Sequence, residues 1–261
     1  MNTIIIIPAR YGSTRFPGKP LHMIAGKSML ERIWRIAKAI ERVDQVYITT
    51  EDSRIIDHAE EFGAKALLTP ESCRNGTERC HALISQFDAP PDVIINLQGD
   101  AVLTPPWILQ ALVDAFSDHP DLAMATPAVR LTWEQATSLG QAKQTTPASG
   151  TLVTFDHAHQ ALYFSKLMIP FVRQPNLASC CPYFRHIGLY GYKASILERL
   201  ISLPPSPLEQ AESLEQLRAL ENGIPIHVVE VDYQGRSHWS VDSPEDVKIV
   251  EDLIAQEGEL V

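Results

Sequence analysis

The sequence is poor in cysteine, and the few cysteines it has are not arranged as a metal or redox motif. The chain has 261 residues and four cysteines, at Cys73, Cys80, Cys180 and Cys181, and no two of them have C-x-x-C spacing. Zinc sites and disulfide frameworks need cysteines at suitable spacing, so we expect reduced thiols that bind no metal.

Basic residues and long apolar segments are also scarce. Lysine and arginine number 22 against 32 acidic residues, which gives a formal net charge of −10. This balance argues against nucleic acid or an anionic membrane as a partner, although a local basic loop can still bind a small anion. No apolar run reaches the length of a membrane span, and the first residues lack the features of a signal peptide. We therefore expect a cytoplasmic protein.

Hydrophobic residues make up 45% of the chain, enough for one domain over residues 1–261. Strand-sized apolar runs such as Ile4–Ile7, Val46–Thr50 and Val93–Gln98 alternate with helical patterns in the first 120 residues. This alternation predicts an α/β fold with a mostly parallel, Rossmann-like sheet and helices on both faces.

The pattern changes after about residue 120. Short apolar runs separated by loops predict a smaller antiparallel extension over approximately residues 120–195, with one strand at Ile187–Tyr192. A helix is predicted at Leu208–Asn222 and a strand at Ile226–Val231. The last helix is predicted at Pro244–Gln256, with Ser243 as its N-cap.

A Gly/Pro-rich basic loop, Pro8–Leu21, follows the first predicted strand. Parallel α/β sheets bind ligands at the carboxyl ends of their strands, and Arg10, Arg15 and Lys19 could neutralise phosphates there. The loop is neither a G-x-G-x-x-G fingerprint nor a P-loop, because Pro20 follows the lysine where a P-loop has Ser or Thr. A solvated surface turn is the alternative interpretation.

Two carboxylates are candidates for binding a divalent ion. Asp100 follows Gln98-Gly99 at the end of a predicted strand, and Asp242 precedes the last predicted helix. Magnesium on a triphosphate needs one or two carboxylates. Alternatively, Asp100 is a turn residue and Asp242 a helix cap, although Ser243 has the better spacing for a cap.

Seven ordered motifs resemble the 3-deoxy-manno-octulosonate (Kdo) cytidylyltransferases, also called CMP-Kdo synthetases. The motifs are IIIIPARYGSTRFPGKPL (Ile4–Leu21), NGTER (Asn75–Arg79), NLQGD (Asn96–Asp100), ALYFSK with a following IP (Ala161–Pro170), RHIGLYGY (Arg185–Tyr192), PLEQAESLEQLR (Pro207–Arg218) and VDSPED (Val241–Asp246). The resemblance implies a nucleotidyltransferase fold, a homodimer, and transfer of CMP from CTP to the anomeric hydroxyl of an acidic 3-deoxy-2-keto sugar with release of pyrophosphate.

The resemblance also implies roles for individual residues. Expected around CTP are Ala9, Arg10, Gly12, Ser13, Arg15, Lys19, Asn75, Arg79, Gln98 and Gly99. Expected on Mg²⁺ are Asp100 and Asp242, which with Lys19 form the catalytic set, and expected around the sugar are His186, Tyr190, Glu215 and Gln216. Without the resemblance, His186 and Tyr190 would be interpreted as a half-buried aromatic pair on one strand, and Glu215 and Gln216 as part of a solvated helix face.

The sequence departs from the family pattern at several positions. Ala101-Val102 replaces the Glu-Pro that usually follows Asp100, and residues 148–153 lack the family's lysine. Asn75 replaces a serine, and the segment before Asp242 contains Arg236, His238 and Trp239. We predict the same reaction on Kdo or a related sugar acid. The alternatives are a nucleotide-sugar-dependent glycosyltransferase and a non-catalytic nucleotide-binding protein.

Overall fold

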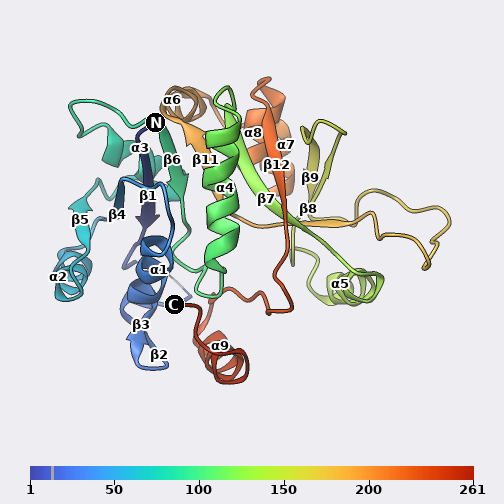
Figure 1. Cartoon of the computed structure of the whole chain (residues 1–261), viewed down its shortest axis with the longest axis horizontal. Coiled ribbons are helices and arrows are strands. Elements are labelled where there is room, and N and C mark those ends of the chain that lie inside the picture. Colours follow the sequence, from blue (N-terminus) through green and yellow to red (C-terminus); the bar gives the residue numbers. More distant parts are fainter. Residues whose placement is uncertain (13–14) are drawn as a thin grey trace.

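A ten-stranded mixed sheet organises the molecule (Figure 1). The computed structural model describes residues 1–12 and 15–261. The strand order is β5-β4-β1-β6-β11-β7-β10-β8-β9, and β12 pairs in parallel with β7. The strands are β1 (Thr3–Pro8), β4 (Gln45–Thr50), β5 (Lys65–Leu68), β6 (Val93–Asn96), β7 (Met124–Arg130), β8 (Leu152–Phe155), β9 (Ala161–Ser165), β10 (Phe184–His186), β11 (Tyr190–Lys193) and β12 (Ile226–Val231).

Helices cover both faces of the sheet, as the sequence predicts. Because successive side chains of a strand point to opposite faces, Ile5 and Ile7 of β1 join one apolar cluster while Ile4 and Ile6 join another. The first face packs against α1 (Met29–Lys38) and α4 (Pro106–Asp118), and the second against α3 (Gly76–Ile84), α6 (Ala194–Ser202) and α8 (Gln216–Glu221). The short helix α2 (Ser53–Glu61) packs beside β4 and β5.

The antiparallel part is continuous with the parallel part. Strand β11 lies between β6 and β7 and is antiparallel to both, so it joins the extension to the central sheet. Strands β10, β8 and β9 continue outward by antiparallel pairing. The chain between β9 and β10, residues 166–183, projects from this end as a long arm (Figure 1).

Three sequence predictions need correction. The predicted strand Ile187–Tyr192 is wrong, because β10 ends at His186 and β11 begins at Tyr190; between them, the Thr126 hydroxyl donates to the Leu189 carbonyl oxygen at 2.6 Å. The predicted helix Leu208–Asn222 is two helices, α7 (Pro207–Glu212) and α8, since Ser213 adopts a left-handed conformation. A helix absent from the prediction, α5 (Trp133–Thr145), follows β7 and begins with a Thr132–Gln135 capping box.

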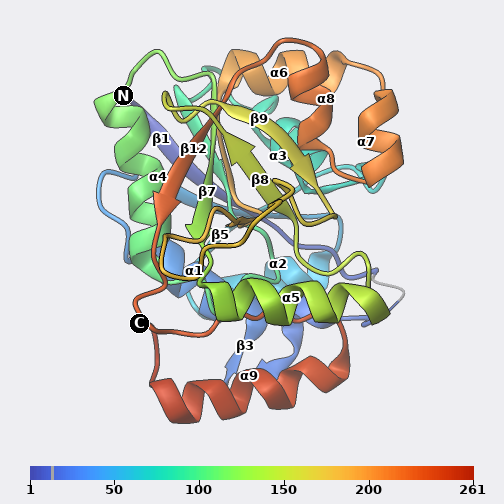
Figure 2. The same cartoon turned by 90° about the vertical axis from the view of Figure 1, so that its right-hand side faces the viewer.

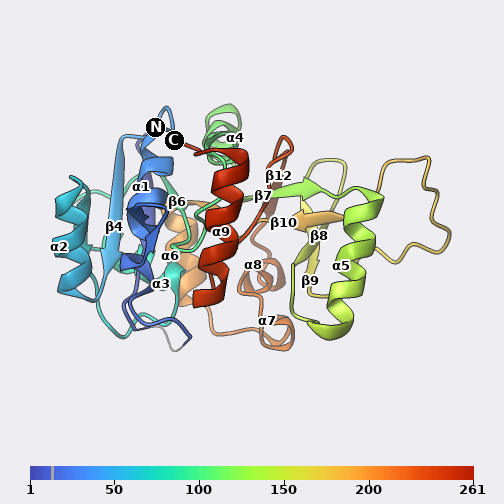
Figure 3. The same ribbon diagram turned by 90° about the horizontal axis from the view of Figure 1, so that it is seen from below.

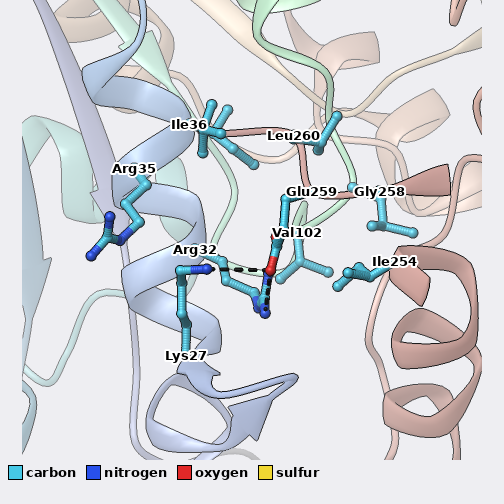
Figure 4. Close-up of a pocket in the computed structure, with 11 residues that line it drawn as sticks. Lys27, Arg32, Arg35, Ile36, Val102, Ile254, Gly258, Glu259 and Leu260 are labelled. Carbon is cyan, nitrogen blue, oxygen red and sulfur yellow. Dashed lines mark hydrogen bonds and ion pairs between the residues drawn. The ribbon is translucent and has the colours of Figure 1, made fainter.

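The carboxyl-terminal segment returns to the amino-terminal half. Helix α9 (Pro244–Glu257) begins at the predicted N-cap Ser243. Beyond it, Glu259 accepts hydrogen bonds from the buried Arg32 guanidinium at 2.7 and 3.3 Å, and it pairs with Lys27 at 3.2 Å (Figure 4). This contact also involves the small hairpin of β2 (Met23–Ile24) and β3 (Lys27–Ser28), because Arg32 donates to the Ile24 carbonyl oxygen. Within residues 1–12 and 15–261, no helix is long and apolar enough to cross a membrane.

Candidate active site

A cavity of about 270 Å³ lies where β1 and β6 end. It brings together most of the predicted CTP and metal residues: Ala9, Arg10, Arg15, Lys19, Asn75, Arg79, Gln98, Gly99, Asp100 and Asp242. Gly12 does not line it, and Ser13 lies outside the described residues. Parallel strands expose backbone amides and polar side chains at this edge, which is where ligands of open α/β sheets bind.

Backbone contacts hold the basic loop over the strand ends. The Ala9 amide donates to the Thr49 carbonyl oxygen at 2.9 Å, and the Tyr11 amide donates to Glu51 at 2.9 Å. The Gly18 amide closes the loop onto the Tyr11 carbonyl oxygen at 3.0 Å, with Gly18 at φ 70°, a conformation that favours glycine. The 3₁₀ turn η1 (Lys19–Leu21) then starts directly at the cavity.

Gly99 lets the ends of β1 and β6 approach each other. A Cβ atom at this position would lie 2.7 Å from the Pro8 carbonyl oxygen, closer than any side chain tolerates. The neighbouring Gln98 amide donates to Asn96 at 3.1 Å, which orients the Gln98 side chain at the cavity. The Gln-Gly-Asp sequence therefore places an amide and a carboxylate beside the loop.

The two aspartates pair with two of the three cations of the basic loop. The Lys19 ammonium lies 3.5 Å from Asp100 and donates to the Val241 carbonyl oxygen at 2.8 Å, while Arg15 donates to Asp242 at 3.1 Å. Burial raises the pKa of Asp100, and the charge of Asp242 adds to this rise while Lys19 opposes it. Both carboxylates line the same cavity, and a divalent cation held by the two would offset their like charges. The donor set fits Mg²⁺, which prefers oxygen ligands.

Helix α3 supplies the opposite wall. Asn75 caps the helix by accepting from the Glu78 amide at 2.8 Å, and Gly76 faces Pro8 and Gln98. Arg79 is 4% exposed and is held by Glu51 at 3.0 Å and by the Thr69 hydroxyl at 2.9 Å. Its guanidinium is therefore preorganised at the cavity, already balanced by one carboxylate.

The predicted sugar residues form two pairs, and Glu215 both contacts this wall and acts electrostatically on Tyr190. The rings of His186 and Tyr190 lie 5.4 Å apart although they belong to different strands. Glu215 accepts from the Thr77 hydroxyl at 2.9 Å and from Asn75 at 3.5 Å, which links this group to the nucleotide cavity. Gln216 is only 4% exposed, and its side-chain amide nitrogen has no hydrogen-bond partner within the described part of the chain. The solvated-face alternative for Gln216 is therefore wrong.

Burial keeps the histidine of the predicted sugar site uncharged. The pKa of His186 is lowered by burial, and further by Lys166, to about 3, so the imidazole is neutral at physiological pH. Its Nε2 lies 2.9 Å from the Thr126 hydroxyl. Burial also raises the pKa of Glu215, against the opposing effect of the Thr77 hydrogen bond.

Comparisons with known proteins identify the family and the fold. The family model for cytidylyltransferases matches residues 4–229. The chain belongs to the cytidylyltransferase family. A 3-deoxy-manno-octulosonate cytidylyltransferase of Maricaulis maris is 52% identical over 261 residues, covering 100% of both chains. An 8-amino-3,8-dideoxy-manno-octulosonate cytidylyltransferase of Shewanella piezotolerans is 37% identical, covering 98% of this chain and 99% of its own. A solved CMP:2-keto-3-deoxy-manno-octonic acid synthetase complexed with CTP superposes with a TM-score of 0.87 at 35% identity, covering 98% and 100% of the two chains.

One candidate residue of this cytidylyltransferase escaped the sequence prediction. Lys166 follows β9 and acts electrostatically on His186, yet within residues 1–12 and 15–261 its ammonium has no ion-pair partner. The backbone there is held by Glu212, which accepts from the Lys166 amide at 2.9 Å and from the Ser165 hydroxyl at 2.7 Å. The position of Lys166 at the end of the ALYFSK motif was the sequence feature that could have identified it.

Proposed function

We propose that this cytidylyltransferase joins CMP from CTP to the anomeric hydroxyl of Kdo or a closely related 3-deoxy-2-keto sugar acid and releases pyrophosphate. The observation that carries the proposal is the meeting of Lys19 and Arg15 with Asp100 and Asp242 at the mouth of one cavity. Cations for a triphosphate and carboxylates for a divalent ion are then next to each other. Such a site works mainly by positioning and charge neutralisation.

The chain's own groups would hold and orient both substrates. Arg10, Arg15 and Lys19 would neutralise the triphosphate, and the Gln98 amide would contact the nucleotide. Asp100 and Asp242 would hold Mg²⁺, which when bound lowers the pKa of a coordinated hydroxyl and neutralises phosphate charge. His186, Tyr190, Glu215 and Gln216 would hydrogen-bond the sugar hydroxyls, because together their side chains supply both donors and acceptors.

An acidic sugar also needs a cation in its pocket. Among the four predicted sugar residues none is cationic, and the pKa of His186 is too low for it to serve. Lys166, beside His186 and without an ion-pair partner in the described ranges, would pair with the sugar carboxylate. We favour Kdo over its 8-amino analogue because the 52% identical relative is named for Kdo and the 8-amino relatives are 37% and 38% identical.

The antiparallel extension exposes apolar side chains. Four apolar side chains of the extension are largely exposed, namely Leu162, Leu167, Phe171 and Leu177, and Phe171 is 88% exposed. Covering such side chains is favourable, so we propose a homodimer joined through the arm.

We place the enzyme in the cytoplasm, where CTP is available. We treat residues 1–261 as one domain because one sheet spans both halves.

A substrate panel tests the function. The purified chain would be incubated with Mg²⁺, each of the four nucleoside triphosphates, and Kdo, 8-amino-Kdo or a sialic acid, and pyrophosphate release would be measured. We expect turnover with CTP and Kdo at least tenfold above every other pair. Turnover only with a nucleotide sugar as donor would favour a glycosyltransferase, and no turnover with any pair would refute the proposal.

A further inference from the structure

A second cleft, separate from the nucleotide cavity, is lined by residues of α5 and α9. These two helices lie on the same side of the molecule (Figures 2 and 3). Its floor is formed by the ends of β7 and β12 and by β10, and one wall is the segment from Tyr233 to Trp239. Its volume is about 1360 Å³, and Leu131, Leu139, Ile187 and Leu253 give it apolar walls. The segment Arg236–Trp239, which departs from the family pattern, thus faces this cleft.

Arg185 lies on the cleft floor without an anionic partner. The end of β7 flanks it on one side, since Arg185 pairs with Val129 across the sheet. The described part of the chain offers this guanidinium no carboxylate within 4.0 Å and no hydrogen-bond acceptor. Burial lowers the pKa of Arg185, and Tyr233 opposes this only when its phenol ionises. Burial also raises the pKa of Tyr233, so this phenol is uncharged near neutral pH. Arg185 is therefore a partly buried cation whose charge no nearby carboxylate offsets within the described residues.

A neighbouring cation adds to the uncompensated positive charge of Arg185. Lys143 of α5 acts on it as a like charge, and the Lys143 ammonium donates only to backbone carbonyl oxygens, including that of Gly150 at 2.7 Å. His238 also faces Arg185; burial and then the Arg185 charge lower its pKa to about 4, and its Nδ1 lies 2.6 Å from the Tyr233 hydroxyl. Positive charge therefore collects around Arg185, although Glu134, Glu230 and Asp232 also line the cleft, each beyond ion-pair distance of this guanidinium within the described residues.

The other two arginines of the cleft are neutralised within the chain. Arg130 pairs with Glu230 at 3.2 Å, and its guanidinium stacks 4.3 Å from the centroid of the Phe184 ring. Arg236 pairs with Glu257 at 3.7 Å. The contrast between these paired arginines and Arg185 shows that the cleft does not simply collect basic side chains.

We propose that this cleft binds an organic anion whose acidic group pairs with Arg185 and whose apolar body packs between α5 and α9. An inorganic anion would satisfy the guanidinium but leave the apolar walls in water. A neutral apolar ligand would cover the walls and leave the charge uncompensated. The site is separate from the nucleotide cavity, shares none of its lining residues, and does not depend on the proposed reaction.

Two fluorescent probes with nearly the same body test the proposal on the full chain without CTP or sugar. Anilinonaphthalene sulfonate carries an anionic group, and N-phenyl-1-naphthylamine does not. We expect the wild-type protein to bind the sulfonate at least tenfold more tightly than the neutral amine. Equal or tighter binding of the neutral probe would overturn the proposal, as would absence of sulfonate binding, which is also the outcome if a second copy of the chain covers the cleft.

Two variants locate the binding. Arg185→Gln should weaken sulfonate binding at least tenfold, whereas the matched variant Arg130→Gln, which removes a paired guanidinium from the same cleft, should change it less than twofold. Equal losses in the two variants would refute the role of Arg185. Inorganic sulfate should displace the probe only at far higher concentration than the probe's own dissociation constant, and displacement at similar concentrations would contradict a role for the apolar walls. The comparison of the two probes on the wild type remains decisive if a variant fails to fold.

Discussion

The Lys19 ammonium lies 3.5 Å from Asp100 and hydrogen-bonds the Val241 carbonyl oxygen, one residue before Asp242. One lysine of the first loop therefore contacts both segments that bear the candidate metal ligands. The Val241 amide, at 3.5 Å from the Asp100 carbonyl oxygen, adds a weak direct contact between these segments. The position of Asp242 thus depends on the loop that would also bind the triphosphate.

Asp100→Asn should lower kcat by about 10²-fold or more, because it removes a charge that would hold the divalent ion, as losses of single charge-stabilising groups do. CTP binding should stay detectable, since Arg10, Arg15 and Lys19 remain. Steady-state kinetics and calorimetric titration with CTP would check both results. The control Asp92→Asn removes an aspartate outside the cavity and should leave kcat within twofold. Near-normal turnover of Asp100→Asn would remove this residue from the proposed metal site.

Lys166→Met should raise KM for the sugar acid by about tenfold or more and leave KM for CTP within twofold. The reason is that the variant removes the cation proposed for the sugar carboxylate, and a charge-assisted pair contributes about 1.5–3 kcal/mol. Lys166→Arg should recover most of the loss. Kinetics with each substrate varied in turn would measure this. Equal effects on both KM values would indicate a general structural role instead.

His186 should make the free energy of unfolding decrease as the pH is lowered below neutrality. Its folded-state pKa is about 3, below the ordinary value of 6.5. Between these values the unfolded chain binds the proton and the folded chain does not, so stability is present above pH 6.5 and is lost as pH falls toward 3. At pH 5 the loss is about 2 kcal/mol, from 1.5 pH units at 1.36 kcal/mol each. Urea unfolding of the wild type and His186→Gln at pH 7 and pH 5 would test this; equal pH dependence in the two proteins would contradict it.

Glu259→Ala should destabilise the fold by about 1–3 kcal/mol, because Arg32, only 5% exposed, would lose its carboxylate partner (Figure 4). We expect a smaller loss of stability than for a fully buried ion pair, because the Glu259 side chain is 42% exposed. Thermal unfolding would measure the change. Asp252→Ala breaks the exposed pair with Lys248 and should cost less than about 0.5 kcal/mol. Equal costs would show that Glu259 does not support the buried arginine.

Phe171→Ser should shift the chain from dimer toward monomer if the arm joins two copies. The side chain is 88% exposed, so its loss leaves the folded monomer unaffected. Light scattering after size-exclusion chromatography would report the mass. Leu68→Ser is the matched control, since Leu68 is 55% exposed on β5 at the opposite edge of the sheet. A monomeric wild type, or an unchanged dimer in the variant, would contradict the proposed interface.

Local chemistry explains which parts of this protein could be predicted. The buried run of β1, the end of β12 at Val231 and the Ser243 cap of α9 depend on neighbouring residues, and the structure matches them. Helix α5 was missed because only one of its residues, Ala136, is buried, which leaves a weak apolar pattern. The break at Ser213 was missed because a left-handed serine has no sequence signature comparable to that of glycine.

The alternation of strands and helices, the family motifs and the chemical types of the candidate site residues follow from residue order and local spacing, so they could be predicted before folding was considered. Only the tertiary structure brought Asp242 beside Arg15 and set Asn75 within reach of Glu215. It also placed Arg185 in a second cleft with no carboxylate of the described residues within 4.0 Å. Such contacts join residues far apart in the chain, and they arise from the order in which strands pair and from the packing of helices on the sheet, which no local pattern encodes.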